Sequence, residues 1–366
     1  MDRENHMSDS NQMSGQSGSA LGGKLVMITR KVDENDALAG FTYNWVKEIA
    51  SNLEKLYVIT WQKSDAGGLP ENIEVISLPD GKIKKVFFLK LKLLKLLSRV
   101  DGVFCHMNPE YTIIAAPIAK IFRKRVVSWY THRSVTLRRR MLEVFANKIV
   151  TANMESFPNP KYPKKVEAIG HGIDTDLFKP AEDKKSDDKF TIISVGRISP
   201  TKDYESIIKA VDEIDDEKIN FKIIGDVILR YQIKYLDTLK KMARAMRIAD
   251  QVKFTGWVAN RDMVPHYQNA DLFINMSGTG SVDKVVLEAM ASGCMVLTSN
   301  DAFRDIIPIE LMVEKDNPKS LAEKIRWVME LSEEEKNNCK KRLREEVVQN
   351  HNLHNLAKKI IKQFFK

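Results

Sequence analysis

The sequence predicts an α/β fold built from two successive, doubly wound domains, and three observations support this prediction. Short apolar runs rich in β-branched residues alternate with helical segments after residue 23, a pattern typical of a parallel sheet covered by helices on both faces. A polar stretch at residues 179–189 interrupts the alternation, which then starts again. The length of 366 residues is sufficient for two cores of ordinary size.

The first domain is expected to span residues 24–178. Runs of β-forming residues predict strands at residues 25–29, 56–60, 73–77, 102–105, 125–130, 148–151 and 166–169. Helical periodicity predicts helices at residues 44–50, 82–99 and 111–122. The preceding residues 1–23 are rich in Ser, Gln, Asn and Gly and contain no apolar run, so we expect a disordered tail there, neither a signal peptide nor a membrane-spanning helix.

Residues 179–189 are expected to form a linker, and residues 190–345 the second domain. Strands are predicted at residues 190–195, 221–225, 252–255, 272–275 and 294–298, and helices at residues 204–214, 232–248 and 283–291. A C-terminal helix over residues 346–366 is expected to pack back on the first domain. Two domains of this kind enclose a cleft, which is a usual place for a ligand.

A loop of small residues that leads into a helix is the first candidate binding site. Residues 277–281 read Ser-Gly-Thr-Gly-Ser, so their amides and those of the helix start are expected to be open to an anion such as phosphate. Glu288 lies within the apolar helix, where a carboxylate needs hydrogen-bond donors. A basic neighbour would satisfy this carboxylate, and so would the two hydroxyls of a ribose. The residues alone leave both alternatives open.

Two cations follow the strand predicted at residues 190–195. Gly196 lets the chain turn at the carboxyl end of this strand, which places Arg197 at the sheet edge and Lys202 about one turn later. A guanidinium and an ammonium group can together neutralise a diphosphate. Without further context, the same two residues are also compatible with solvated surface charges.

Several polar residues and a glycine stand at turns of the first domain. His132 and His106 each follow a predicted strand, where a histidine is either structural or faces the cleft. Gly40 precedes the first helix, where it either makes a simple turn or brings amides close to a diphosphate. Asp174 and Asp176 have the spacing of a metal-binding acidic pair.

Positive charge is concentrated in the first domain. The net charge is +9, and between Gly81 and Arg140 fifteen Lys and Arg residues stand against Asp101 and Glu110. From Lys82 to Arg99 the basic residues follow one stripe of the predicted helix, opposite a wide Phe/Leu face. This stripe is either a solvated helix edge or a surface that contacts an anionic membrane. Nucleic acid is not expected as a partner, because no nucleic-acid fold or aromatic interleaving accompanies the charge.

The cysteines and the hydropathy indicate the cellular compartment in which the protein is expected. Cys105, Cys294 and Cys339 are far apart and odd in number, which favours free thiols in a reducing environment over a disulfide framework. No run reaches the roughly 18 apolar residues that a membrane-spanning helix needs. We therefore expect a cytoplasmic protein, with a peripheral position at the inner membrane face as the alternative that the basic surface suggests.

Taken together, these motifs resemble the signatures of retaining glycosyltransferases of family 4, whose GT-B fold consists of two Rossmann-like domains. The run LEAMASG at residues 287–293 is similar to a donor-binding signature with two glutamates eight positions apart; Glu288 matches the second, and Gly280 occupies the position of the first. The run VGR followed by Lys202 resembles the family's phosphate motif, with Asp203 where glycine is usual.

Two further runs extend the resemblance. GHGIDTDLF at residues 170–178 is similar to the segment that closes the family's first domain, with His171 where Asn is common. This context argues against a metal site at the two aspartates, and it leaves open whether His171 contacts the donor or caps a turn. FTGWV at residues 254–258 and HYQNAD at residues 266–271 resemble a run of the second domain; the loop at Trp257 and Val258 either packs against a nucleotide base or belongs to the core.

The resemblance implies transfer of a sugar from a nucleotide-diphosphate sugar to a glycan or lipid-linked acceptor, with retention at the anomeric carbon and without metal or cofactor. Polysaccharide or glycolipid synthesis at the cell surface is the expected setting. Because Gly280 cannot replace a glutamate, Asp283 or Lys284 is expected to take over its role. The expected catalytic residues are His132, Arg197, Lys202 and Asp283. The expected donor-binding residues are Gly40, Gly196, Arg197, Lys202, Trp257, Val258, Gly278, Thr279, Gly280, Ser281, Val282, Lys284 and Glu288.

Two other functional classes stay open. A sugar-nucleotide epimerase can share this architecture, and it would convert the donor without an acceptor. A non-catalytic subunit that binds nucleotide sugars is the second alternative, and the missing glutamate at Gly280 favours it. The base, the sugar and the acceptor are not determined by these residues.

Overall fold

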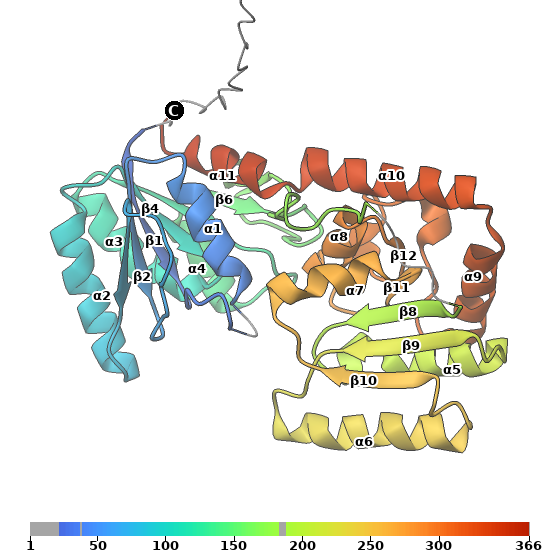
Figure 1. Ribbon diagram of the computed structural model, residues 1–366. Coiled ribbons are helices and arrows are strands. Elements are labelled where there is room, and N and C mark those ends of the chain that lie inside the picture. Colours follow the sequence, from blue (N-terminus) through green and yellow to red (C-terminus); the bar gives the residue numbers. More distant parts are fainter. Residues whose placement is uncertain (1–21, 37–38, 183–187, 366) are drawn as a thin grey trace, which may run out of the picture.

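Two parallel β-sheets, each covered by helices, lie side by side in the computed structural model (Figure 1). The structure describes residues 22–36, 39–182 and 188–365. Most of the predicted N-terminal tail, residues 1–21, and the middle of the predicted linker, residues 183–187, lie outside the described residues. The two sheets confirm the predicted α/β fold class.

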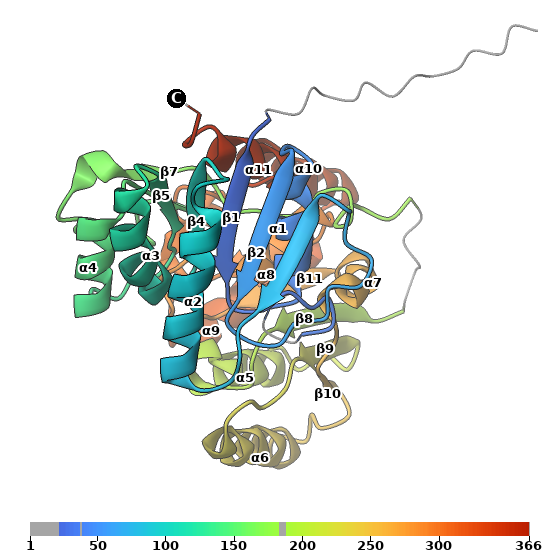
Figure 2. The ribbon, with the colours of Figure 1, turned by 90° about the vertical axis from the view of Figure 1, so that its left-hand side faces the viewer.

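The first sheet has seven strands in the order β3-β2-β1-β4-β5-β6-β7. These are β1 (Lys24–Thr29), β2 (Lys55–Thr60), β3 (Ile73–Ser77), β4 (Gly102–His106), β5 (Arg125–Trp129), β6 (Lys148–Thr151) and β7 (Val166–Ala168). The helices are α1 (Phe41–Ala50), α2 (Lys82–Leu96), α3 (Pro109–Ile121) and α4 (Leu137–Phe145). Figure 2 shows α2, α3 and α4 along one side of this sheet, with α1 on the other.

The second sheet has five strands in the order β10-β9-β8-β11-β12. These are β8 (Phe190–Val195), β9 (Ile219–Ile224), β10 (Val252–Gly256), β11 (Leu272–Asn275) and β12 (Met295–Thr298). The helices of this part are α5 (Tyr204–Ile214), α6 (Arg230–Ala245), α7 (Val264–Gln268), α8 (Lys284–Ala291), α9 (Pro318–Glu330), α10 (Glu333–Asn350) and α11 (Leu353–Ile361).

Strand order determines where a ligand can bind. The chain order reverses between β1 and β4 in the first sheet and between β8 and β11 in the second. In open parallel sheets, such reversals leave a crevice at the carboxyl ends of the strands. The loops after β1, β8, β9 and β10 all contribute to one cavity between the domains.

The C-terminal helices connect the two domains. Figure 1 shows α10 along the second domain and α11 over the first, where α11 packs against α1. Ile173 anchors the crossing, because its amide donates to the carbonyl of His351 and its carbonyl accepts from Leu353, both at 2.8 Å. Gly170 permits the close approach, since a Cβ there would lie 1.7 Å from the carbonyl oxygen of Asn350.

Helix α4 is absent from the sequence-based prediction. Three consecutive arginines, residues 138–140, obscured its apolar periodicity. In the structure the middle one, Arg139, is buried, with its guanidinium 3.9 Å from the centre of the Phe157 ring. The hydroxyl of Thr136 caps the helix by accepting a hydrogen bond from the Arg139 amide at 3.2 Å.

Candidate functional site

A cavity of about 590 Å³ between the domains brings together most of the predicted site residues. The first domain contributes the loop before α1, and the second contributes the loops after β8, β9 and β10 together with the start of α8. The predicted residues that line the cavity are Gly40, Gly196, Arg197, Lys202, Trp257, Val258, Thr279, Asp283, Lys284 and Glu288. The residues implied for diphosphate, base and ribose therefore face one space.

Cations and a helix start meet at one end of this cavity. Arg197 is exposed at the carboxyl end of β8, and Lys202 lies beyond it. Lys284 and Val285, the first two residues of α8, also line the cavity. A helix start carries unpaired amides and a partial positive charge, so this end of the cavity suits a diphosphate.

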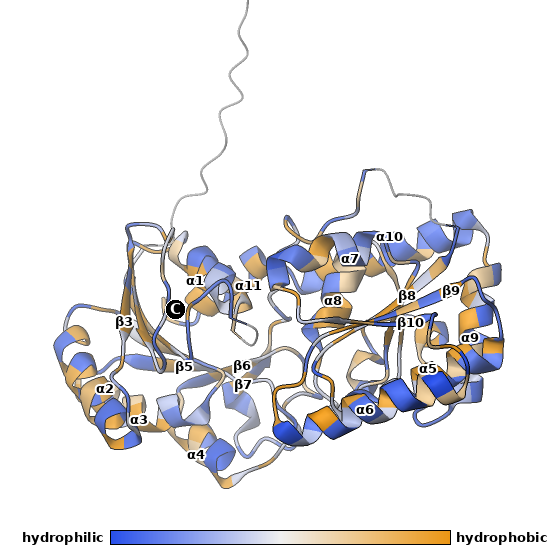
Figure 3. Ribbon diagram, turned by 60° about the horizontal axis from the view of Figure 1, so that its bottom comes forward, coloured by the Kyte–Doolittle hydropathy of each residue, from blue (hydrophilic) through white to orange (hydrophobic). Residues whose placement is uncertain are grey.

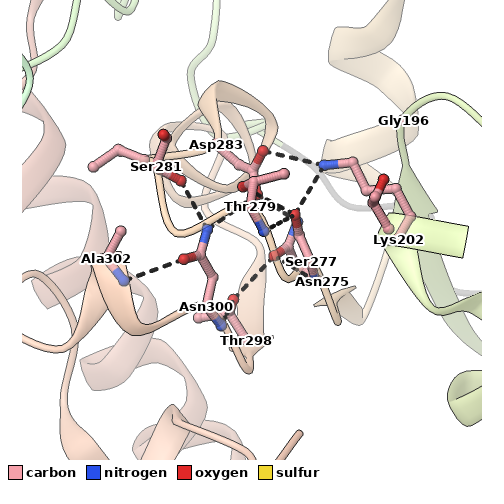
Figure 4. A network of polar contacts seen from close by, with 12 residues as sticks. Gly196, Lys202, Asn275, Ser277, Thr279, Ser281, Asp283, Thr298, Asn300 and Ala302 are labelled. Carbon is pink, nitrogen blue, oxygen red and sulfur yellow. Dashed lines mark hydrogen bonds and ion pairs between the residues drawn. The ribbon is translucent and has the colours of Figure 1, made fainter. Parts of the chain in front are cut away.

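Asp283 is the centre of a polar network just before α8 (Figure 4). Its carboxylate accepts from the Lys202 ammonium group at 3.1 Å, and from the side-chain amides of Asn300 at 3.2 Å and Asn275 at 3.4 Å. The Thr279 hydroxyl donates at 3.4 Å. Asp283 therefore fixes the Lys202 side chain against the loop that precedes α8.

The small-residue loop differs from its prediction. Gly278 donates its amide to the carbonyl of Thr201 at 3.1 Å, and Val282 donates its amide to the Ser156 hydroxyl at 3.4 Å. These amides fix the loop within the protein, so they are not open to a phosphate as expected. Gly278, Gly280, Ser281 and Val282 do not line the cavity. The first two residues of α8, Lys284 and Val285, line it instead.

Glu288 is satisfied by neutral donors. Its two oxygens accept from the side-chain amide of Asn260 and from the Tyr267 hydroxyl, each at 3.0 Å. The carboxylate is almost buried and still borders the cavity. Burial raises its pKa, while Lys284 and the two hydrogen bonds oppose that rise. Among the described residues Glu288 forms no direct ion pair, and it borders the cavity in which the hydroxyl groups of the other alternative would lie.

Lys284 carries the most perturbed amine at the site. Its ammonium nitrogen lies 2.6 Å from the centre of the Phe41 ring, which belongs to α1 of the first domain. Removal from water lowers the pKa of Lys284 to about 7, and the nearby Glu288 opposes this change. An amine that titrates near neutral pH thus stands between the two domains.

His132 lies apart from the interdomain cavity. It lines a second cavity, of about 570 Å³, together with residues of the loops after β4 and β5 and of α3 and α4 in the first domain. Its Nδ1 accepts a hydrogen bond from the Ser134 amide at 3.1 Å. The expectation that His132 and the donor-binding residues border one space is therefore not met.

The other polar residues of the first domain have local structural contacts. His106 is buried beside the Thr29 hydroxyl at 3.0 Å, and burial lowers its pKa to about 3, so the ring is neutral. His171 caps a turn, because its Nδ1 accepts from the Gly172 amide at 2.9 Å. Asp174 also caps a turn, accepting from the amides of residues 176 and 177.

Residues 176–346 match the family of glycosyl transferases group 1. The second domain belongs to this family. The match covers the β8 loop, the cavity-lining start of α8 and the LEAMASG run, and it confirms the resemblance that the motifs indicated. None of the described helices combines the length and the hydropathy that crossing a membrane requires.

Curated relatives of this glycosyltransferase domain match over part of their length. The chain is 29% identical over 119 residues to the alpha-monoglucosyldiacylglycerol synthase of Streptococcus pneumoniae (strain ATCC BAA-255 / R6), which covers 32% of this chain and 26% of that protein. It is 28% identical over 155 residues to the GDP-mannose-dependent alpha-(1-6)-phosphatidylinositol monomannoside mannosyltransferase of Mycobacterium tuberculosis (strain CDC 1551 / Oshkosh), which covers 37% of this chain and 38% of that protein.

Solved structures show that the GT-B fold extends over both domains of the chain. Anabaena Alr3699/HepE in complex with UDP superposes with a TM-score of 0.75 at 15% identity, over 93% of this chain and 99% of that chain. The lipopolysaccharide outer core galactosyltransferase WaaB superposes with a TM-score of 0.62 at 14% identity, over 93% of this chain and 99% of that chain. At these identities the likeness establishes the fold.

Several residues of the cavity were not anticipated from the sequence. Phe41 and residues 226–228, which follow β9, line it, as do Asn260 and Tyr267. Gly225 offered a signal, because it ends β9 as Gly196 ends β8. A Cβ at Gly225 would lie 1.9 Å from the Gly196 carbonyl oxygen, so the two loops pack directly against each other.

Proposed function

We propose that this protein transfers a sugar from a nucleotide-diphosphate sugar to an acceptor hydroxyl, with retention at the anomeric carbon. The observation that carries the proposal is the interdomain cavity, where Arg197, Lys202 and the start of α8 face the same space as Trp257 and Glu288. The cations and helix amides suit the diphosphate, the indole suits the base and the carboxylate suits the ribose.

The residues support the reaction by electrostatics. In the proposed step the bond from the anomeric carbon to the diphosphate breaks, and the acceptor oxygen bonds to that carbon on the same face. The acceptor proton passes to a diphosphate oxygen. Arg197 and Lys202 stabilise the negative charge that develops on the leaving diphosphate, and such stabilisation is commonly the largest contribution to catalysis. These residues perform this role without a metal.

A product assay tests the proposed activity. After a thermal-shift panel of nucleotide sugars has identified the bound donor, that donor is incubated with the protein and with lipid or glycan extracts. Transfer gives a new glycoside that retains the donor's anomeric configuration, measured by NMR. Conversion of the donor to an isomer without acceptor would indicate the epimerase, and binding without any turnover would indicate a non-catalytic subunit.

A lipid-linked acceptor is the second part of the proposal, and helix α2 supports it. The predicted Phe/Leu face of α2 consists of a buried part and an exposed part. Leu89, Leu93 and Leu96 are buried, whereas Ile83, Phe87, Leu91 and Leu94 are exposed. Basic residues flank these exposed side chains, and helix α4 shows the same pattern, with Leu137 and Val144 exposed beside Arg138 and Arg140. Figure 3 shows that hydrophilic and hydrophobic stretches alternate along both helices. Apolar side chains flanked by lysines and arginines suit the surface of an anionic bilayer.

Membrane association at the cytoplasmic face is tested with vesicles. The protein is expected to sediment with vesicles of phosphatidylglycerol and phosphatidylcholine and to bind far less to phosphatidylcholine alone. The double variant Phe87→Ser/Leu94→Ser should lose about tenfold or more in binding, because each apolar side chain contributes through its burial. Ile309→Ser, a change at an exposed apolar residue of the second domain, is the control. Equal sedimentation of all three proteins would exclude α2 as the membrane contact.

A further inference from the structure

Arg133 has a guanidinium with no partner in the part of the chain that the structure describes. It lies in the loop between β5 and α4, and its side chain is exposed. It forms no ion pair or hydrogen bond with any described residue. The arginines of α4 differ, since Arg138 pairs with Glu110 at 2.8 Å and Arg140 with Glu143 at 3.0 Å. Arg133 is therefore available to a ligand.

Gly280 of the second domain provides the space that Arg133 occupies. A Cβ at residue 280 would lie 2.5 Å from Nη1 and 2.8 Å from Cδ of Arg133. Gly280 also has φ +64°, a conformation that favours glycine. Any side chain at this position would displace the guanidinium. At the position where the resemblance places a glutamate, this chain has a cation from the other domain.

Arg133 and Gly280 line neither cavity themselves, but each is next in sequence to a residue that does. Thr279, next to Gly280, lines the interdomain cavity, and His132, next to Arg133, lines the second cavity. Thr279 and Lys202 both donate to Asp283, so Thr279 lies beside a cation of the proposed diphosphate site. The guanidinium of Arg133 therefore lies close to both cavities, since it approaches Gly280 beside Thr279 and belongs to the residue after His132.

We propose that Arg133 is a specificity-determining residue that binds an anionic substituent close to the transferred sugar. A guanidinium pairs with carboxylate and phosphate through two parallel hydrogen bonds and is costly to leave unpaired when a ligand excludes water. The anion is either the carboxylate of a hexuronate in the donor or a phosphate on the acceptor. This inference rests on the proposed function, because it assumes that a nucleotide sugar occupies the interdomain cavity.

Calorimetry tests the donor as the source of the anion. The nucleoside diphosphate that binds, UDP or GDP, determines which ligands are compared. If UDP binds, UDP-glucuronate is compared with UDP-glucose; if GDP binds, GDP-mannuronate is compared with GDP-mannose. The uronate is expected to bind about tenfold or more tightly than the neutral sugar nucleotide, as a charge-assisted pair implies. Arg133→Ala should remove this preference while the free nucleoside diphosphate binds as before, and Arg133→Lys should retain part of it.

A second arm tests the acceptor as the source. With the nucleoside diphosphate present, glucose 6-phosphate is titrated against glucose, and the same tenfold preference and the same loss in Arg133→Ala are expected. Arg99→Ala, which removes an exposed arginine elsewhere in the first domain, controls for net charge. The inference is overturned if neither anionic ligand is preferred, or if the preference persists in Arg133→Ala. Absence of binding by any nucleoside diphosphate would instead refute the proposed function.

Discussion

Glu288 accepts one hydrogen bond on each oxygen, from Asn260 and from Tyr267. An ionised carboxylate has about four acceptor positions, so two remain for the hydroxyls of a ribose in the cavity. We expect Glu288→Gln to weaken the binding of a nucleoside diphosphate by about tenfold, since one charge-assisted hydrogen bond is lost. Calorimetry with the 2′,3′-dideoxy nucleotide provides the check, because the variant should no longer discriminate against it. Unchanged discrimination would exclude ribose as the partner of Glu288, and Glu74→Gln on the surface is the control.

Lys284 predicts a pH dependence of donor binding. Its pKa is about 7 in the free protein, and a diphosphate beside it would raise that pKa. Binding then takes up a proton, so affinity for a nucleotide sugar should increase as pH falls from about 9 to about 7 and level off below. The diphosphate ester of the ligand does not titrate in this range. Lys284→Met should abolish both the change of affinity with pH and the proton uptake, measured by calorimetry in buffers of different ionisation enthalpy. If the affinity of this variant still changed with pH as in the wild type, another group would be responsible.

Asp283 lines the cavity and also holds other side chains of the site in place. Because its carboxylate holds Lys202 and Asn300, Asp283→Ala should leave the cations present and release their alignment. We expect transfer to fall about 100-fold or more, as for other losses of oriented charge, while nucleotide affinity changes little. Parallel measurements of turnover and of binding decide the point. A proportional loss of both would make Asp283 a simple binding residue, and Asp237→Ala on the exposed face of α6 serves as control.

The sequence predicted which side chains belong to this site better than it predicted their hydrogen-bond partners within the protein. Arg197, Lys202 and Glu288 were found because charges beside glycine turns or inside apolar helices are conspicuous in a sequence. Their hydrogen-bond partners were not, since Asn260 and Tyr267 lie 28 and 21 residues from Glu288 and meet it through folding alone. The hydrogen bonds of the Gly278 and Val282 amides were missed for the same reason, because their acceptors Thr201 and Ser156 are distant in sequence.

At the scale of elements, the strands were predicted almost to the residue, because β-branched apolar runs bounded by polar turns are a local signal. Helix α4 was missed because its buried position is occupied by Arg139, an exception that the ring of Phe157 and the carboxylate of Glu143 explain. The sequence-based prediction gave α2 a single apolar face, whereas the structure has one buried and one exposed apolar face. Sequence periodicity records which positions are apolar, but only packing distinguishes the buried face from the exposed one.

Helix α11 is expected to stabilise the first domain although it follows the second in the chain. Leu356 is buried at its centre, where it approaches Gly172 together with Trp45 of α1. Leu356→Ala should therefore cost about 2–4 kcal/mol of unfolding free energy, by lost burial and cavity formation. Urea unfolding followed by tryptophan fluorescence measures this, since Trp45 reports on the contact. The neighbouring Lys358→Ala, at an exposed position, should cost little, and an equal loss in both variants would contradict the role of α11.

At the scale of the whole molecule, the number of domains was evident from the sequence and their mutual orientation was not. The contacts that set the orientation join residues far apart in the chain. Arg261 pairs with Glu34 at 3.1 Å, and the Asn153 side chain donates to the Ala302 carbonyl at 3.0 Å. No local pattern encodes such pairs. They bring the loop of Gly40 and the start of α8 together in the lining of one cavity.

The most direct test of the central claim is a calorimetric titration of the wild-type protein and of the double variant Arg197→Ala/Lys202→Met with UDP, GDP and the corresponding nucleosides. We expect one diphosphate to bind the wild type about 100-fold more tightly than its nucleoside, because two charge-assisted contacts are gained. The double variant should lose this difference. Equal affinity of both proteins for the diphosphate, or no binding of any nucleotide, would contradict a donor site between the domains.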